Sequence, residues 1–366
     1  MDRRPVMSAV LFLLLASPAY GQQMSEEGTV ERSLPGATKA TAAGATAVMD
    51  KVDRKEIGGT VPNVQQGRVD LPPKQELEHR VALYESAVRD AESAHASDTR
   101  VARLYVQLGL WYQDLALWNR SEADLERAVT LFRRASESES EPETSGELAT
   151  AINNLGILHV MMWKLSEAER DEQEALRMRE EMKDRLQIAR SWSDLAALYL
   201  AQHKFAKARD FAKQSLAELV ANGHADAFDR IFARYAYSLA LCSTKDCPSA
   251  IPVLKDAIDE AKATMRSGDF PIGLGEFLLG FAYWRSGEAA AAAQYMGQGT
   301  SLMKEQLGWG HPTYLNALEK YARFLRENQR GDEAKIVERE IRQAEAVVDV
   351  RSMQTQTSTL SFAGLR

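Results

Sequence analysis

Residues 150–159 read TAINNLGILH, and residues 190–199 read RSWSDLAALY. Each stretch holds a leucine, then a small residue, then a ring-bearing side chain three positions further on. The two large residues are four positions apart, so they lie on one face of a helix. The small residue between them lets a neighbouring helix approach closely. The two stretches therefore predict helices that pack tightly against a partner.

The same pattern recurs along most of the chain. The small residue returns at intervals of 47, 40, 42, 42 and 42 positions, at Gly109, Gly156, Ala196, Ser238, Gly280 and Ala322. A second small residue stands twelve positions after each, at Ser121, Ala168, Ala208, Ala250, Ala292 and Ala334. The second small residue falls where a returning helix would cross the first. Each unit is therefore predicted to be a helical hairpin, and hairpins this small must stack to bury their apolar faces.

This pattern resembles the tetratricopeptide repeat family over residues 101–345, through Leu155-Gly156, Leu195-Ala196 and Leu279-Gly280 with the alanines that follow them. The usual repeat of the family is about 34 residues. The spacing of 42 here is similar to that of the long kinesin light chain type. The resemblance implies an all-α, right-handed superhelical solenoid of about six antiparallel helix pairs. We expect residues 74–100 to form a capping helix before it, and Gly287 and Gly331 to lie in turns within hairpins.

Residues 1–21 have the features of a secretory signal peptide. Two arginines precede the apolar run MSAVLFLLLA at 7–16, and Ala19-Tyr20-Gly21 is a small-x-small cleavage site. We therefore expect export to a periplasm or to the extracellular space. Residues 22–73 are rich in Gly, Ala and Thr and predict a flexible tether, and residues 346–366 predict a C-terminal tail.

Composition narrows the function classes. Hydrophobic residues make up 45% of the 366 positions, which excludes a chain disordered throughout. The net charge is −7, so the basic excess typical of a nucleic-acid binder is missing, and we expect no nucleic-acid partner. The apolar run at 7–16 is too short to span a bilayer, and no later run reaches the required length, so no transmembrane span is predicted after signal cleavage.

The residue types that usually act in catalysis or bind metals do not form a recognisable site. The six histidines are scattered, His159 occupies a packing position, and we predict no catalytic, cofactor-binding or metal site. The acidic residues at 169, 171, 172 and 174 are interpreted as a solvated helix face. Cys242 and Cys247 are the only cysteines. They either form a disulfide in an oxidising compartment or remain two small buried thiols, and the sequence leaves both readings open.

The repeat register predicts a partner-binding groove, because the first helix of each hairpin lines the concave face of such a solenoid. The candidate groove residues are Asn153, Asn154, Arg190, Asp194, Phe232, Tyr235, Phe277, Phe281 and Trp284. The asparagines could hydrogen-bond a peptide backbone or be ordinary surface residues, and the aromatics could be binding anchors or helix packing.

Two functions remain for such a chain. The first is an exported, non-enzymatic scaffold that binds a protein or peptide in its groove. The alternative is an architectural component of a cell-envelope assembly that self-associates or stacks with other subunits. The sequence does not indicate the oligomeric state.

Overall fold

The computed structural model describes residues 74–115, 117–138, 142–265, 270–307 and 312–355. The predicted signal peptide and tether lie outside these residues. The described chain is helical throughout and contains no strand. Thirteen helices follow one another in it: α4 (Lys74–Ser93), α5 (Asp98–Asp114), α6 (Trp118–Ser138), α7 (Pro142–Met161), α8 (Leu165–Glu181), α9 (Arg185–Ala201), α10 (Phe205–Ala221), α11 (Ala227–Ser243), α12 (Cys247–Thr264), α13 (Phe270–Arg285), α14 (Ala289–Leu307), α15 (Pro312–Glu327) and α16 (Gly331–Thr355).

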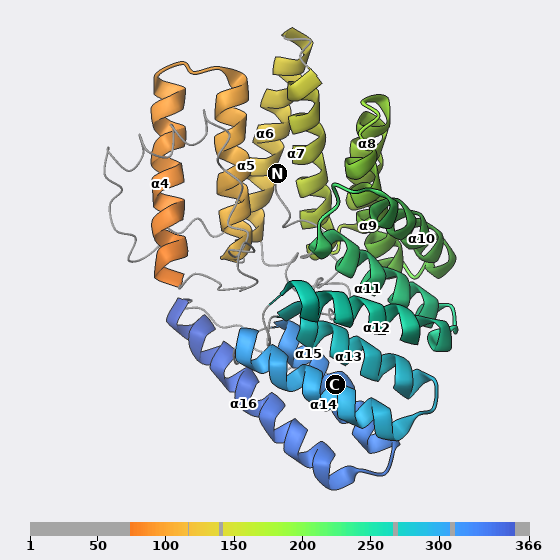
Figure 1. Ribbon diagram of the computed structural model, residues 1–366. Coiled ribbons are helices and arrows are strands. Elements are labelled where there is room, and N and C mark those ends of the chain that lie inside the picture. Colours follow the sequence, from red (N-terminus) through yellow and green to blue (C-terminus); the bar gives the residue numbers. More distant parts are fainter. Residues whose placement is uncertain (1–73, 116, 139–141, 266–269, 308–311, 356–366) are drawn as a thin grey trace.

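The helices α5 to α16 form six consecutive antiparallel pairs, which confirms the predicted solenoid (Figure 1). The helix α4 packs on α5 ahead of the first pair. It ends at Ser93, so the predicted capping helix is shorter than residues 74–100. The boundary predicted for the tail, at residue 346, falls inside α16, which continues to Thr355.

The two small residues of each unit lie where the paired helices cross. The six residues at the second small position are all buried. A Cβ atom added at Gly280 would lie 2.5 Å from the backbone nitrogen of Met296 and 3.0 Å from the carbonyl oxygen of Ala292. Gly109 similarly faces the carbonyl oxygen of Ser121 at 3.3 Å. The backbones of paired helices therefore meet at these positions, as the spacing predicts.

The turns inside the last five hairpins share one conformation. The residue seven positions after the first small residue has a positive φ in every case: 56° at Trp163, 56° at His203, 65° at Lys245, 85° at Gly287 and 61° at Gln329. The next amide then reaches back to a carbonyl five residues earlier, as from Lys204 to Tyr199 at 2.8 Å. This left-handed end stops the first helix and reverses the chain. Gly287 lies at this place as predicted, whereas Gly331 is the first residue of α16.

Several helices begin at a side-chain cap. The side chain of Asp226 accepts a hydrogen bond of 2.8 Å from the backbone amide of Asp229, and that of Asp184 accepts one of 3.1 Å from the amide of Gln187. Such caps satisfy amides that have no partner within the helix. They fix the starts of α11 and α9, the helices that carry several of the predicted groove residues.

Candidate binding surface

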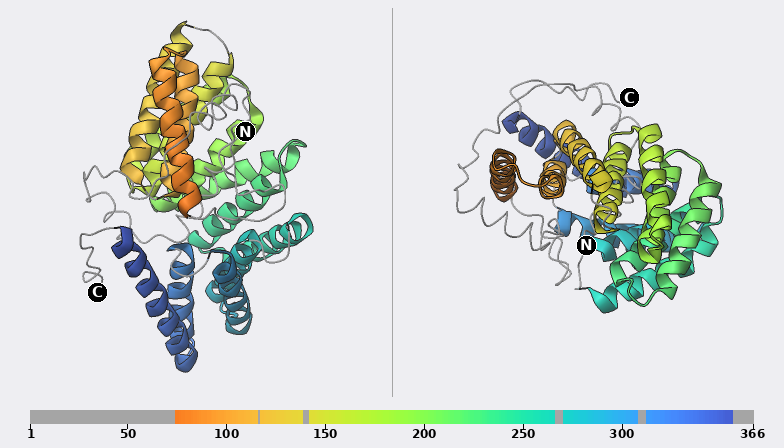
Figure 2. Two further views of the ribbon diagram at one scale, coloured as in Figure 1. Left: turned by 90° about the vertical axis from the view of Figure 1, so that its left-hand side faces the viewer. Right: turned by 90° about the horizontal axis from the view of Figure 1, so that it is seen from above.

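The first helices of the pairs lie on the inner side of the solenoid. Contacts join α5 with α7, α7 with α9, α9 with α11 and α11 with α13. Figure 2 shows from two further sides how the helices follow one another along the solenoid. A concave surface of the kind predicted would therefore be formed by side chains of the odd-numbered helices, and the exposure of each side chain decides whether a partner can touch it.

Three of the four polar groove residues of the second and third pairs are buried. Asn153, Asn154 and Asp194 keep 4%, 1% and 2% of their surface exposed. The Nδ2 atom of Asn153 lies 3.1 Å from Oδ2 of Asp194 and 2.9 Å from Oε2 of Glu172. The prediction that these three contact a partner is therefore wrong for this conformation, because they lie within the contact between α7, α8 and α9.

Two further charged residues complete this buried group. Arg179 of α8 donates from Nη2 to Oδ1 of Asn153 at 2.8 Å and from Nη1 to the hydroxyl of Ser191 at 2.5 Å. Glu172 is 1% exposed, so its interpretation as part of a solvated face is wrong. A Cβ atom at Gly156 would lie 2.9 Å from Oε1 of Glu172, so this glycine opens the space that the carboxyl group occupies. Asn153, Glu172, Arg179, Ser191 and Asp194 are called the junction cluster below.

Burial changes the pKa values of the two acids in the junction cluster. Desolvation raises the pKa of Asp194 to about 7, against the opposing effects of Asn153, Arg179 and Arg190. Desolvation, and then the negative charge of Asp194, raise the pKa of Glu172 well above its ordinary value. Two carboxyl groups that meet at one amide nitrogen cannot both be charged without cost.

Arg190 remains at the edge of the inner face. Its Nη2 atom lies 2.7 Å from Oδ2 of Asp229, and its side chain keeps 11% of its surface exposed. The ion pair joins α9 to α11. A partner would find its guanidinium group already held by a carboxylate.

Three of the predicted aromatic anchors belong to the core. Phe232, Tyr235 and Phe277 are buried and lie in one hydrophobic cluster whose members come from helices between α7 and α16. The physical reason is the close packing of neighbouring first helices, which covers the faces that register alone assigns to the groove. The prediction that these three rings contact a partner is therefore wrong, and their other reading, helix packing, is right.

Phe281 and Trp284 are different. Both are only partly buried, and they lie three residues apart on the same face of α13. Their rings meet edge to face with centroids 5.8 Å apart, and Trp284 also meets Phe324 of α15 at 5.7 Å. These two residues, here called the aromatic pair, are the predicted anchors that remain accessible.

His159 is a core residue, as predicted, but its partners are charged. Its Nδ1 atom lies 2.6 Å from Oδ2 of Asp171, and its Nε2 atom lies 3.0 Å from Oε1 of Glu122. Burial alone would lower the pKa of His159, but the two carboxylates outweigh it and raise the pKa to about 9. The histidine is therefore a buried cation that links α6, α7 and α8.

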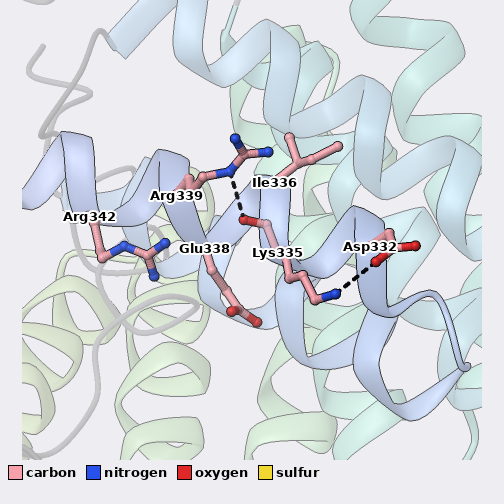
Figure 3. A pocket seen from close by; sticks show the side chains of 6 residues that line it. All are labelled: Asp332, Lys335, Ile336, Glu338, Arg339 and Arg342. Carbon is pink, nitrogen blue, oxygen red and sulfur yellow. Dashed lines mark hydrogen bonds and ion pairs between the residues drawn. The ribbon is translucent and has the colours of Figure 1, made fainter.

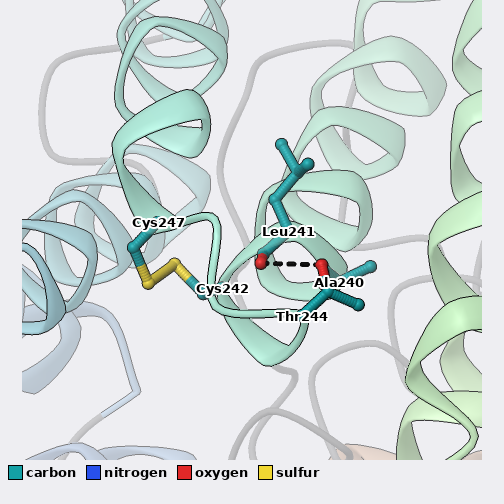
Figure 4. The surroundings of a disulfide bond; sticks show 5 residues. All are labelled: Ala240, Leu241, Cys242, Thr244 and Cys247. Carbon is teal, nitrogen blue, oxygen red and sulfur yellow. Dashed lines mark hydrogen bonds between the residues drawn. A yellow bond between two sulfur atoms is a disulfide. The ribbon is translucent and has the colours of Figure 1, made fainter.

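Cys242 and Cys247 form a disulfide, which decides between the two readings of the sequence (Figure 4). Their Cα atoms are 4.1 Å apart. Cys242 belongs to α11 and Cys247 begins α12. The bond therefore closes the turn within the fourth hairpin.

Two hollows on the described surface are shallow. One of about 480 Å³ lies along α16 and is lined by that helix alone, with an ion pair of 2.8 Å between Lys335 and Asp332 at one end (Figure 3). Another of about 320 Å³ lies between α6, α7 and α8, with Ile152 and Leu155 in its lining. Neither includes a predicted groove residue.

The described residues contain neither a metal-binding cluster nor a membrane-spanning helix. No group of three or more His, Cys, Asp or Glu side chains there is arranged to hold a metal ion. In the same ranges, no helix combines the length and the apolar character that crossing a membrane requires.

The repeats match known sequence families. Two models described as tetratricopeptide repeat match the chain, one over residues 101–141 and one over residues 147–217. No curated protein sequence matches it significantly.

Solved structures are similar in fold. The apo form of RapI shares 13% identity at a TM-score of 0.62, over 75% of this chain and 94% of RapI. BtubC (BKLC) from P. vanneervenii shares 16% identity at a TM-score of 0.52, over 68% of this chain and 97% of BtubC. A Rap protein complexed with Competence and Sporulation Factor shares 13% identity at a TM-score of 0.51, over 84% of this chain and 94% of the Rap protein. The chain therefore carries tetratricopeptide repeats over residues 101–141 and 147–217, within a solenoid of stacked helix pairs.

Proposed function

We propose that this protein is an exported, non-enzymatic scaffold that binds a peptide segment of a partner protein on the inner face of its solenoid. The observation that carries the proposal is the aromatic pair. Phe281 and Trp284 are partly exposed on a first helix, while the predicted aromatic residues of α11 are fully buried. Large rings held rigidly at an accessible surface are frequent anchors of protein interfaces.

Two further observations support peptide binding. The family is built from stacked hairpins whose concave surface typically binds extended segments. A Rap protein of similar fold has been crystallised in complex with Competence and Sporulation Factor. The aromatic pair would take an apolar side chain of the segment, with the rings arranged edge to face around it.

Export rests on residues 1–21 and is supported by the disulfide. A structural disulfide persists mainly in oxidising compartments, and this chain has its only two cysteines joined. Fractionation of cells that express the full chain with a C-terminal tag tests this. We expect the tagged protein outside the cytoplasm with Gln22 as its first residue. Cytoplasmic protein that retains Met1 would exclude export.

The binding proposal is tested by affinity purification of the exported chain from its own envelope fraction, followed by mass spectrometry. Three proteins are compared: the wild type, Phe281→Ala/Trp284→Ala, and the control Val220→Ser. Val220 is 55% exposed on α10, a second helix, so its loss removes an apolar surface group outside the inner face. A partner retained by the control and lost from the double variant supports the proposal. A partner retained by both variants, or oligomers of the chain in place of a partner, favours the architectural alternative.

A further inference from the structure

The junction cluster lies where the solenoid changes direction. Figure 1 shows the axes from α4 to α8 running nearly parallel, whereas α11 to α14 lie across them. The helix α9 lies between these two groups. Its Asp194 is bonded to Asn153 of α7, and its Ser191 is bonded to Arg179 of α8. The contact between the second and third helix pairs therefore contains a buried polar group.

The charges of the cluster do not balance when both acids are ionised. Glu172 and Asp194 are both within hydrogen-bond distance of Nδ2 of Asn153, and Arg179 is the one cation bonded within the cluster. The Oδ1 atom of Asp194 is buried without a hydrogen-bond partner among the described residues. One proton on the acid pair makes the net charge of these three groups zero, whereas its loss leaves one buried negative charge.

The surrounding groups do not supply the missing positive charge. Arg190 of α9 is held by Asp229 of α11, and His159 of α7 is held by Asp171 of α8 and Glu122 of α6. Asp184, at the start of α9, adds a further carboxylate near Arg179. The groups facing the cluster from α6, α7, α8, α9 and α11 therefore leave it short of cations.

We propose that this junction is a proton-controlled joint: Glu172 and Asp194 hold one proton between them, and its release loosens α9 from α7 and α8. The pair titrates as a unit, so the proton belongs to neither acid alone. With the proton bound, the joint is neutral and closed. Without the proton, the uncompensated charge draws water into the contact. The helices up to α8 and those from α9 onward then move more freely against each other. This inference goes beyond the proposed function and does not depend on it.

The direction of the effect follows from burial. Desolvation raises the pKa of both acids in the folded chain, so the folded state binds the proton more tightly than the unfolded state does. Stability of the joint is therefore highest at low pH and is lost as pH rises through neutrality. Desolvation also raises the pKa of Asp124 on α6 to about 7, so this residue has the same direction of pH dependence. Asp124 lies beside Glu85 of α4, away from the joint.

Hydrogen exchange with mass spectrometry, corrected for the intrinsic effect of pH, tests the joint at pH 5.5 and pH 8. In the wild type we expect amides of α9 to exchange at least about tenfold faster at pH 8, while those of α13 change little. Asp194→Asn keeps an oxygen that accepts from Asn153 and removes the titration, so its α9 amides should be equally protected at both values. Asp124→Asn, the matched control, should keep the wild-type contrast in α9.

Two results would overturn the proposal. One is equal protection of α9 at both pH values in the wild type, and the other is a contrast that persists in Asp194→Asn. Glu172→Gln removes the other member of the acid pair and gives a second, independent arm in case Asp194→Asn does not fold, which circular dichroism at pH 5.5 will show. A wild-type contrast that survives in the folded Glu172→Gln protein contradicts the joint equally.

Discussion

The phenol oxygen of Tyr235 on α11 donates a hydrogen bond of 2.8 Å to the carbonyl oxygen of Pro271 on α13. The bond crosses between neighbouring first helices and leaves no room for a partner at this ring. Gly275 makes the approach possible, because a Cβ atom there would overlap with the Tyr235 hydroxyl. The inner side of the fourth and fifth pairs is therefore a packed core next to an accessible edge.

This arrangement separates the roles of two phenylalanines on α13. Phe277 is buried in the core, so Phe277→Ala should lower the free energy of unfolding by about 3–5 kcal/mol. Phe281 is partly exposed, so Phe281→Ala should cost less than half as much. Urea denaturation followed by circular dichroism measures both. Equal losses would mean that Phe281 is also a core residue and would remove it from the aromatic pair.

Close backbone contact makes Gly280 sensitive to a single methyl group. A Cβ atom there would lie 2.5 Å from the backbone nitrogen of Met296, which cannot move without shifting α14. Gly280→Ala should therefore destabilise the protein by about 1–3 kcal/mol. Gly223→Ala is the control, since its Cβ atom would meet nothing within 4 Å. Thermal unfolding compares the two, and a neutral Gly280→Ala would show that the fifth hairpin is packed more loosely than described.

The left-handed turn predicts a different contrast between two exposed glycines. Gly287 has a φ of 85°, whereas Gly331 begins α16, and a Cβ atom at either would meet nothing within 4 Å. Gly287→Ala should cost about 1 kcal/mol, because an L side chain is strained in this conformation. Gly331→Ala should be neutral or slightly stabilising, because alanine favours a helix. Similar effects of the two substitutions in denaturant titrations would mean that backbone conformation does not matter at this turn.

The buried cation at His159 predicts that stability also depends on pH, over a higher pH range than at the junction cluster. Its pKa is raised from 6.5 to about 9 in the folded chain, so its contribution to stability is complete below pH 6.5 and lost as pH rises through 9. In His159→Gln, the fall in the free energy of unfolding between pH 6.5 and pH 9 should be smaller by on the order of 3 kcal/mol. Chemical denaturation at a series of pH values measures it. An identical fall in both proteins would show that the histidine is not charged at neutral pH.

The sequence was sufficient to predict the hairpins because small residues at fixed spacing report backbone contacts directly. Gly280 and Ala292 meet as their twelve-residue separation requires. The turn at Lys245 was harder to predict, since a lysine carries no signal for a left-handed conformation. The helical end of the chain to Thr355 was missed because residues after 350 lose the apolar period, although the helix continues.

The candidate surface was predicted less well, because register places a residue on a helix but does not say how closely the next helix covers it. Phe232 and Phe281 share a predicted role and differ only in that cover. The junction cluster was missed because Glu172 stands among other acids that make an ordinary charged face. Its position sixteen residues after Gly156, whose missing side chain makes the space, was the available signal.

Photo-crosslinking in the native host tests whether a partner binds on the inner face. The photoreactive residue p-benzoylphenylalanine replaces Phe281 in one strain and Val220, 55% exposed on the outer helix α10, in another. On irradiation, we expect a discrete adduct with another protein from position 281 and none from position 220. An adduct from position 220 alone, or adducts only between copies of this chain, would contradict it.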